Sequence, residues 1–223
     1  MDSASAKINV RKLMAFTLPL ATLMALSGLR SLLGSSSQYW IYPIQTVLCG
    51  VLILVFWRDY EFRAVIKPVF TIAIGLLVFV FWIAPQAFCL GFTSRHVGFD
   101  PSIFSSEPAI YAATLGLRFL RLVVVIPLVE EIFFRGFLLR YLIKEAFQTV
   151  SIGVFSWFSF TAVAVCFGLV HSPADWIAGV FAGALYNLVV YRTKNLASAV
   201  LAHAITNLLL GVWIMKTGQW GFW

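Results

Sequence analysis

Long apolar runs are the feature that most constrains what this chain can fold into. A helix needs about 20 consecutive apolar residues to cross a bilayer, and the chain contains a series of runs close to or above that length. Backbone N–H and C=O groups in lipid must bond internally, so spans are helices or strands of a closed barrel. The runs do not alternate apolar with polar residues, which favours helices. They cover residues 13–29, 39–57, 68–84, 110–142, 152–170, 174–191 and 196–215.

The composition agrees with a membrane protein. Of the 223 residues, 61% are hydrophobic and 11% are charged, whereas a soluble domain carries about 25% charged residues. We therefore predict an all-α fold, a polytopic membrane helix bundle of about seven or eight transmembrane helices. The first run, 13–29, is longer than the apolar core of about 7–15 residues in a signal peptide, so we expect a retained anchor helix.

The fourth run, 110–142, is too long for one straight span of about 20 residues. Pro127 has no N–H for an intrahelical hydrogen bond, and we expect it to kink or break the helix just before Glu130. The segments 110–126 and 128–142 are then either two pieces of one bent helix or an interfacial helix followed by a span.

Positive charge predicts the orientation. A formal net charge of +7 would suggest nucleic acid as a partner of a soluble protein, but in a membrane protein an excess of Lys and Arg marks the cytoplasmic loops. We therefore expect no nucleic-acid partner and an N-terminus in the cytoplasm. Alternating the runs across the bilayer places 11 of the 16 basic residues on that side: Lys7, Arg11, Lys12, Arg58, Arg63, Lys67, Arg135, Arg140, Lys144, Arg192 and Lys194.

Cysteines and small residues in the runs have simple interpretations. Cys49, Cys89 and Cys166 lie far apart and without C-x-x-C spacing, so we expect buried packing residues rather than a metal or redox site. Gly179 and Gly183 have the spacing that lets two membrane helices approach closely.

Ionised side chains inside the fourth run are the strongest functional signal. Each costs roughly 2.5–3.5 kcal/mol at membrane depth on insertion scales, so such residues are rare and usually functional. Glu131 and Arg135 have the i,i+4 spacing of an intrahelical ion pair. Glu130 points about 100° away from Glu131 on a helix and is the freer carboxylate. Alternatively, the cluster lies at the membrane interface and is solvated, as the following Arg140 would allow.

Polar residues on two later runs are candidates to face Glu130. His171 follows the fifth run, while His203 and Asn207 share one face of the seventh at i,i+4 spacing. Taken singly, His171 is typical of an interfacial or capping residue, and the other two could equally be hydrogen-bonding contacts between helices. Polar residues on three spans are most economically explained by a shared water-filled cavity.

This set of residues suits the hydrolysis of an amide. Glu with His supplies a general base for water, and His with Asn supplies hydrogen-bond donors for an oxyanion. The residues Glu130, His171 and His203 could also bind a divalent cation such as zinc, although the H-E-x-x-H motif is absent from the sequence.

The position of His171 along the chain raises a difficulty. At a rise of about 1.5 Å per residue, Glu130, His203 and Asn207 lie roughly 10–16 Å from the cytoplasmic ends of their runs. His171 precedes the sixth run and would lie roughly 26 Å away if that run crossed straight. Either the turn at 172–175 is buried within the protein or the sixth helix is strongly tilted. We predict the buried turn, because non-helical backbone at depth is tolerated where it lines a cavity.

Three motifs in this part of the chain resemble those of a known family. They are E-E-x-x-x-R at 130–135, F-x-x-x-H at 167–171 and H-x-x-x-N at 203–207. In order and interval they are similar to the motifs of the CPBP intramembrane proteases, which include the type II CAAX prenyl endopeptidases and the bacterial Abi proteins. The resemblance covers about residues 117–213, and the chain is also similar to a bacterial subgroup called CAAX prenyl protease-related.

The resemblance implies a membrane endopeptidase with a conical or open cavity inside the bundle. It also implies roles for four residues: Glu130 and His171 would activate the attacking water, and His203 and Asn207 would form the oxyanion hole. A peptide or protein substrate at the membrane is the expected partner, and the plasma membrane of a bacterium is the expected location.

The same resemblance implies supporting roles and leaves the cofactor open. Arg135 would brace the site or pair with Glu131. A metal-free glutamate mechanism is favoured, and zinc held by Glu130, His171 and His203 is the alternative.

Two other functions stay open at the level of sequence. One is a non-catalytic membrane chaperone or immunity protein of the same fold, and the other is a proton-coupled transporter, which the lack of an inverted repeat disfavours. We divide the chain into residues 1–109, with N-terminal transmembrane helices and a loop without a recognised motif, and residues 110–223, the catalytic helix core.

Overall fold

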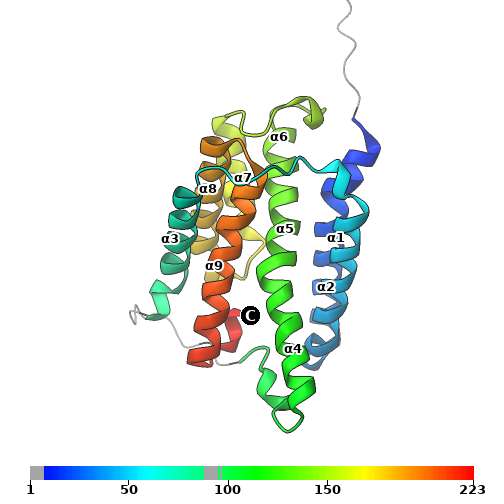
Figure 1. Ribbon diagram of the computed structural model, residues 1–223, viewed down its shortest axis with the longest axis vertical. Coiled ribbons are helices and arrows are strands. Elements are labelled where there is room, and N and C mark those ends of the chain that lie inside the picture. The colour runs from blue at the N-terminus through cyan, green and yellow to red at the C-terminus, as the bar shows by residue number, and fades with distance from the viewer. Residues whose placement is uncertain (1–7, 88–94, 96) are drawn as a thin grey trace, which may run out of the picture.

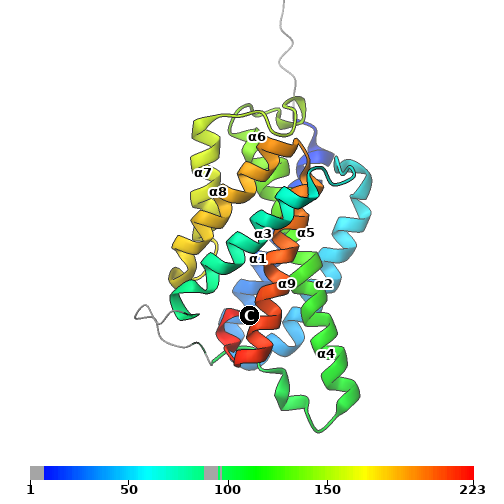
Figure 2. The same cartoon turned by 60° about the vertical axis from the view of Figure 1, so that its left-hand side comes forward.

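A computed structural model describes residues 8–87, 95 and 97–223. These residues form helices and no strand, so the predicted all-helical membrane bundle is confirmed. The helices run alongside one another (Figures 1 and 2). They are α1 (Val10–Leu33), α2 (Gln38–Val55), α3 (Pro68–Ala87), α4 (Pro108–Leu120), α5 (Ile126–Glu131), α6 (Leu139–Tyr141), α7 (Trp157–Leu169), α8 (Trp176–Thr193) and α9 (Leu196–Thr217).

The surface of the bundle is apolar and its interior contains polar groups. Large side chains such as Leu54, Val69 and Ile177 are 72%, 81% and 78% exposed, whereas Glu131 and Arg135 are fully buried. Five helices in the described part of the chain are long and apolar enough to cross a membrane: α1, α2, α3, α8 and α9. Since apolar side chains gain nothing from contact with water, this arrangement fits a lipid surround. The chain is an integral membrane protein.

The helices α4, α5 and α6 are parts of one uninterrupted helical stretch that runs the length of the molecule (Figure 1). Two π-helical segments, η4 (Arg121–Val125) and η5 (Ile132–Leu138), join them. Pro127 lies within α5. Of the kink or break expected before Glu130, the break does not occur, which agrees with the alternative of one continuous helix.

The π-helical segment η4 explains how the helix continues past Pro127. Proline in a helix interior lacks an N–H, and its ring clashes with the carbonyl four residues earlier. In η4 the Ile126 N–H bonds to the Arg121 carbonyl, five residues back, which widens the turn. The Leu122 carbonyl is thereby left without a backbone donor from Ile126 or Pro127. It accepts a hydrogen bond of 2.9 Å from Nδ2 of Asn207 instead.

Helices α7 and α8 pack with their backbones nearly in contact. A Cβ atom added at Gly183 would lie 2.8 Å from the carbonyl oxygen of Ala164, and one at Gly179 would lie 2.8 Å from Cα of Gly168. Side chains at either position would push the helices apart. The close approach predicted from the spacing of Gly179 and Gly183 is therefore present.

The turn between α7 and α8 is not buried, contrary to our prediction. Ser172, Pro173 and Ala174 are exposed, and both ribbon views place this turn at about half the height of the molecule (Figures 1 and 2). The physical reason is the shortness of α7. Its 13 residues begin only at Trp157 and extend about 20 Å, so the chain turns back before it reaches the far end of the bundle.

The cysteines follow the prediction only in part. Cys49 is fully buried, as expected. Cys166 is exposed on α7, so the prediction of a buried packing residue is wrong there. The apolar character that suggested burial instead places this side chain on the outer surface of a membrane helix. Cys89, like Lys7 at the N-terminus, lies outside the described residues.

The close packing of α7 on α8 gives a stability prediction. We expect Gly183→Ala to destabilise the protein by about 1–3 kcal/mol, because the new methyl group must displace the backbone of α7. Gly50→Ala is the matched control, since nothing lies within 4 Å of a Cβ at that α2 position, and it should be neutral or stabilising by up to about 1 kcal/mol. Equilibrium unfolding in detergent would measure both. Equal effects of the two substitutions would contradict the close approach.

Candidate active site

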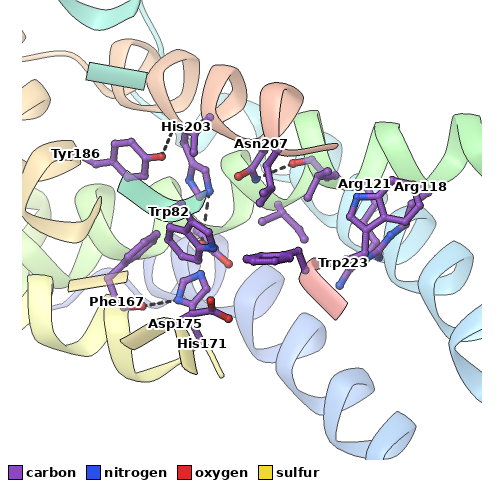
Figure 3. Close-up of a pocket in the computed structure, with 16 residues that line it drawn as sticks. Trp82, Arg118, Arg121, Phe167, His171, Asp175, Tyr186, His203, Asn207 and Trp223 are labelled. Atoms are coloured by element: carbon purple, nitrogen blue, oxygen red, sulfur yellow. Dashed lines mark hydrogen bonds and ion pairs between the residues drawn. The ribbon is translucent and has the colours of Figure 1, made fainter. Parts of the chain in front are cut away.

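One cavity of about 180 Å³ contains all four residues predicted to be catalytic. Glu130 of α5, His171 after α7, and His203 and Asn207 of α9 line it together (Figure 3). His171 reaches this cavity from the turn at half height that the short α7 creates. The polar residues of three separate spans therefore face one space.

The charged cluster of the long helix is not solvated at an interface. Glu130 is 8% exposed, and Glu131 and Arg135 are 0% exposed. The alternative of a solvated interfacial cluster is therefore wrong. Arg140, which had made that alternative reasonable, is itself buried and forms an ion pair of 2.8 Å with Glu61.

Each guanidinium nitrogen of Arg135 has a partner, either on α5 or on α8. Its Nη1 lies 3.0 Å from Oε1 of Glu131, its Nε donates to Oδ1 of Asn187 at 3.0 Å, and its Nη2 donates to the Gly183 carbonyl at 2.8 Å. The guanidinium also lies 4.5 Å from the ring centre of Phe167. A buried cation without such partners would be strongly destabilising. Arg135 therefore pairs with Glu131 and also fixes η5 against α8.

His203 lies between the two glutamates. Its Nδ1 is 2.9 Å from Oε1 of Glu131, and its Nε2 is 4.0 Å from Oε2 of Glu130. An ionised carboxylate only accepts hydrogen bonds, so Nδ1 carries a proton and donates a hydrogen bond to Glu131. Neutral His203 then has its lone pair on Nε2. Only the imidazolium form can also donate from Nε2 into the cavity.

The ring of His203 is held in its orientation by α8 and α9. Tyr186 stacks on it with ring centres 4.9 Å apart and an interplanar angle of 21°. The Tyr186 hydroxyl donates to Oγ1 of Thr206 at 2.8 Å, and Thr206 in turn donates to the Gly75 carbonyl of α3 at 2.8 Å. Three helices thus fix the plane in which the imidazole can act.

Glu130 is the carboxylate that the cavity leaves available. Its Oε2 atom is buried and has no hydrogen-bond partner among the described residues. At 4.0 Å from Nε2 of His203, it is also beyond direct hydrogen-bond distance of that ring. A buried acceptor without a partner is costly, so the position suits a water molecule or a substrate group.

His171 presents a proton acceptor to the same cavity. Its Nδ1 lies 2.7 Å from the Phe167 carbonyl oxygen, which can only accept, so Nδ1 is the protonated nitrogen. The neutral ring therefore has its lone pair on Nε2. Trp82 and Phe167 contact the ring at centre distances of 5.2 and 5.1 Å. The spacing of F-x-x-x-H places a carbonyl and an aromatic ring next to the histidine.

One of the two N–H donors of the Asn207 amide forms a hydrogen bond within the protein, and the other is free. An amide nitrogen has two donors, and one bonds to the Leu122 carbonyl that η4 leaves without a backbone partner. The second can point into the cavity that Asn207 lines. The same side chain thus completes the helix at Pro127 and faces the candidate site.

A comparison with protein families agrees with this constellation. Residues 111–209 match the family model described as Type II CAAX prenyl endopeptidase Rce1-like. This segment is similar to the Rce1-like family. The match lies within residues 110–223 and contains all three motifs, so the resemblance found in the sequence is confirmed. No curated protein and no solved structure gives a significant match to the chain.

The Rce1-like segment contains further residues of the cavity that the motifs did not indicate. Arg118 and Arg121 line it, as do Tyr186 and Thr206. Both arginines lie in an apolar run, where a charge is as costly as it is at Glu130. The same argument could therefore have identified them as candidate site residues. Tyr186 carries no comparable signal, because an aromatic residue in an apolar helix is ordinarily a packing residue.

Among the described residues, no three His, Cys, Asp or Glu side chains are grouped so that they could hold a metal ion. Glu130, His171 and His203, which the zinc alternative requires as ligands, therefore do not form such a group in this structure. Nδ1 of His203 is instead engaged by Glu131.

The dual contact of Asn207 gives a second prediction. We expect Asn207→Ala to destabilise the protein by about 1–3 kcal/mol, because the buried Leu122 carbonyl loses its donor. In a Pro127→Ala background the cost should be smaller, since residue 127 then supplies an N–H to the preceding turn. A double-mutant cycle of unfolding free energies in detergent measures this coupling.

The control for this cycle is Pro108→Ala. Pro108 lies at the first turn of α4. The backbone N–H that alanine would introduce there has no partner within the helix. We expect the changes in unfolding free energy to be additive for Asn207→Ala with Pro108→Ala and non-additive for Asn207→Ala with Pro127→Ala. Additivity in both pairs would contradict the account of η4.

Proposed function

We propose that this chain is an intramembrane endopeptidase that hydrolyses a peptide bond with water activated by Glu130 and His171. One observation carries the proposal: the buried and unpartnered Oε2 of Glu130 shares a cavity with the free Nε2 lone pair of His171. Two proton acceptors around a space that can hold water are what general-base activation of water needs. Similarity of the matched segment to an endopeptidase family supports the same reaction.

In the proposed reaction, Glu130 takes a proton from water as the oxygen attacks the carbonyl carbon of the substrate. His171 accepts a hydrogen bond from the same water through Nε2 and so orients its lone pair. The carbonyl oxygen becomes an oxyanion. As the C–N bond breaks, Glu130 gives its proton to the leaving nitrogen, which releases an amine and a carboxylate product.

His203 and Asn207 would stabilise the oxyanion. The free N–H of Asn207 is one donor, and the Nε2–H of protonated His203 is the other. Glu131 fixes the ring, because its Oε1 lies 2.9 Å from Nδ1 of His203. Arg135 in turn holds Glu131 in place, with its Nη1 3.0 Å from Oε1. Donors fixed in this way need little rearrangement when charge develops.

An apolar groove offers the substrate a lateral route to the cavity. The groove has a volume of about 340 Å³ and lies between α3 and the start of α8. Trp82 and Asp175 line both the groove and the cavity. A hydrophobic peptide segment could therefore enter from the lipid and pass Asp175 to reach the cavity that Glu130 lines.

The basic residues near the α1 end favour placing the N-terminus in the cytoplasm.

The proposal predicts that Glu130→Gln abolishes peptide hydrolysis and leaves the fold intact. The loss should be about 10²–10⁴-fold, because the isosteric amide cannot accept the proton of water. Protein in nanodiscs acting on a membrane-tethered fluorogenic peptide gives the rate, and thermal unfolding gives the stability. His171→Gln should lose activity to a similar degree.

The matched control is Glu145→Gln, the same change at an exposed carboxylate in the loop after α6, which should leave the rate unchanged. Full turnover by the Glu130→Gln protein would overturn the proposed mechanism. If that protein also kept its activity in the cell, a non-catalytic chaperone or immunity role would take its place.

A metal-free mechanism predicts that turnover survives chelation. The proposed proton transfers use only Glu130 and His171, and we therefore expect full activity after dialysis against EDTA and 1,10-phenanthroline. Elemental analysis of the active protein should find zinc well below one equivalent. Loss of activity that added zinc restores would contradict this expectation.

A further inference from the structure

The segment that follows α9 turns back into the cavity. Gly218 caps α9 with a φ of 66°, a left-handed conformation that changes the direction of the chain. The 3₁₀ turn η8 (Trp220–Phe222) comes next. Phe222 and Trp223 both line the cavity that contains Glu130. The chain therefore places two of its own aromatic side chains in its candidate active site.

Trp223 is held in the cavity by aromatic and cationic neighbours. Its ring centre lies 5.9 Å from that of Phe99 and 6.0 Å from that of Phe119. The guanidinium carbon of Arg118 lies 5.4 Å from the same ring, beside which it is seen in the close-up (Figure 3). Nε1 of Trp223 is buried and has no hydrogen-bond partner among the described residues. Because a buried donor without a partner is costly, the indole packs here but lacks the hydrogen bond of a permanent core position.

Backbone contacts give residues 219–223, the post-α9 segment, a defined docked position. The Gly221 N–H donates a hydrogen bond of 2.8 Å to the Arg95 carbonyl. A Cβ atom added at Gly221 would lie 2.8 Å from Cβ of Arg95, and one added at Gly98 would collide with the Trp220 carbonyl. The two stretches of backbone can meet only because both positions are glycine.

Arg95 connects the post-α9 segment to the entrance of the cavity. Its guanidinium carbon lies 4.3 Å from the ring centre of Phe222, and its Nη1 lies 2.8 Å from each carboxylate oxygen of Asp175. Asp175 lies four residues after His171 and lines both the apolar groove and the cavity. One side chain therefore links the docked segment to the point where a peptide would pass from the groove into the cavity.

The cavity is small for a peptide while the post-α9 segment lies in it. Its volume is about 180 Å³, whereas pockets that bind ligands of drug size measure about 300–1,000 Å³. An aromatic side chain has a surface of about 150–250 Å² to bury, so withdrawal of Phe222 and Trp223 would enlarge the space. A rearrangement is therefore needed before a peptide can bind.

The membrane surface offers the post-α9 segment a second position. Trp is enriched at membrane–water interfaces, where its amphipathic ring lies at the level of the headgroups. Trp220, Phe222 and Trp223 come directly after α9, a helix long and apolar enough to cross a membrane. Their rings would thus leave the cavity without entering bulk water. A modest difference in free energy then sets how often the cavity is closed.

We propose that the post-α9 segment is autoinhibitory: it closes the cavity and leaves it when a peptide binds. The proposal rests on the proposed function, because the ligand that the segment excludes is the peptide to be cleaved. Where only the open fraction of a protein binds, the apparent affinity is reduced by that fraction. Removing the two aromatic side chains therefore raises the apparent affinity, whereas a fixed wall of a substrate site would lose affinity with them.

The first test measures access to the cavity and requires no activity. Leu210 lines the cavity and is 6% exposed, so Leu210→Cys places a thiol there. Methyl methanethiosulfonate is added to the protein in nanodiscs, and peptide mass spectrometry follows the reaction at that residue. We expect Phe222→Ala with Trp223→Ala to raise the rate at least fivefold. The matched control Trp157→Ala, at a tryptophan that is 75% exposed on α7, should leave it unchanged.

The second test measures hydrolysis of the membrane-tethered peptide. Phe222→Ala with Trp223→Ala should raise kcat/KM at least threefold, mainly through a lower KM. Arg95→Gln should raise it by a smaller factor, because it removes the contacts with Asp175 and Phe222 and keeps the backbone hydrogen bond.

A reversible tether provides the converse experiment. Arg95→Cys with Gly221→Cys, in protein that also carries Cys89→Ser and Cys166→Ser, places two thiols where a small shift allows a disulfide. The oxidised protein should lose at least fivefold in turnover, and dithiothreitol should restore it. Arg95→Cys alone is the control and should not respond to dithiothreitol.

The outcomes separate the autoinhibitory segment from its premise. An unchanged or slower reaction of the thiol in the folded double variant would overturn the closure, and lower turnover as well would assign the two aromatic residues to a wall of the substrate site. Full turnover by the oxidised, tethered protein would also overturn it, even if the alanine variant failed to fold. A faster reaction without hydrolysis by any variant would keep the closure and overturn the endopeptidase proposal.

Discussion

The guanidinium of Arg135 is the group on which the interior of this protein depends. It is fully buried and must satisfy its donors without water, so it draws acceptors from α5 and α8 to one point. Its partner Glu131 extends the network to His203 on α9, and its partner Asn187 extends it to the Phe160 carbonyl on α7 at 3.0 Å. Partly satisfied networks of this kind are costly. The relative positions of four helical elements are therefore coupled to one ion pair.

The same coupling links the backbone of the long helix to its chemistry. Pro127 lies three residues before Glu130, and η4 lets the helix pass it at the cost of an unpaired Leu122 carbonyl. Asn207 of α9 donates a hydrogen bond to this carbonyl. The residue proposed to stabilise an oxyanion is thus positioned by a hydrogen bond that the helix itself requires. π-helical turns occur frequently at functional sites, and here such a turn places two helices in register.

The cavity is lined by groups of both charge signs. Glu130, Arg118 and Arg121 all line a space of about 180 Å³. Electrostatic interactions are strong where water is excluded. The charges on this one helical stretch therefore act on one another and on whatever enters the cavity.

The sequence by itself determined the helical membrane architecture, the Glu131–Arg135 pair and the four residues that share the cavity. These follow from rules that act within one helix: the length of apolar runs, the i,i+4 spacing, and the cost of polar groups in lipid. Only the tertiary structure decided that the helix continues past Pro127, that α7 ends early with an exposed turn, and that Cys166 faces outward. It also decided that Arg118 and Arg121 line the same cavity as Glu130. Each of these depends on what a neighbouring helix supplies, and spacing along one chain segment does not contain that information.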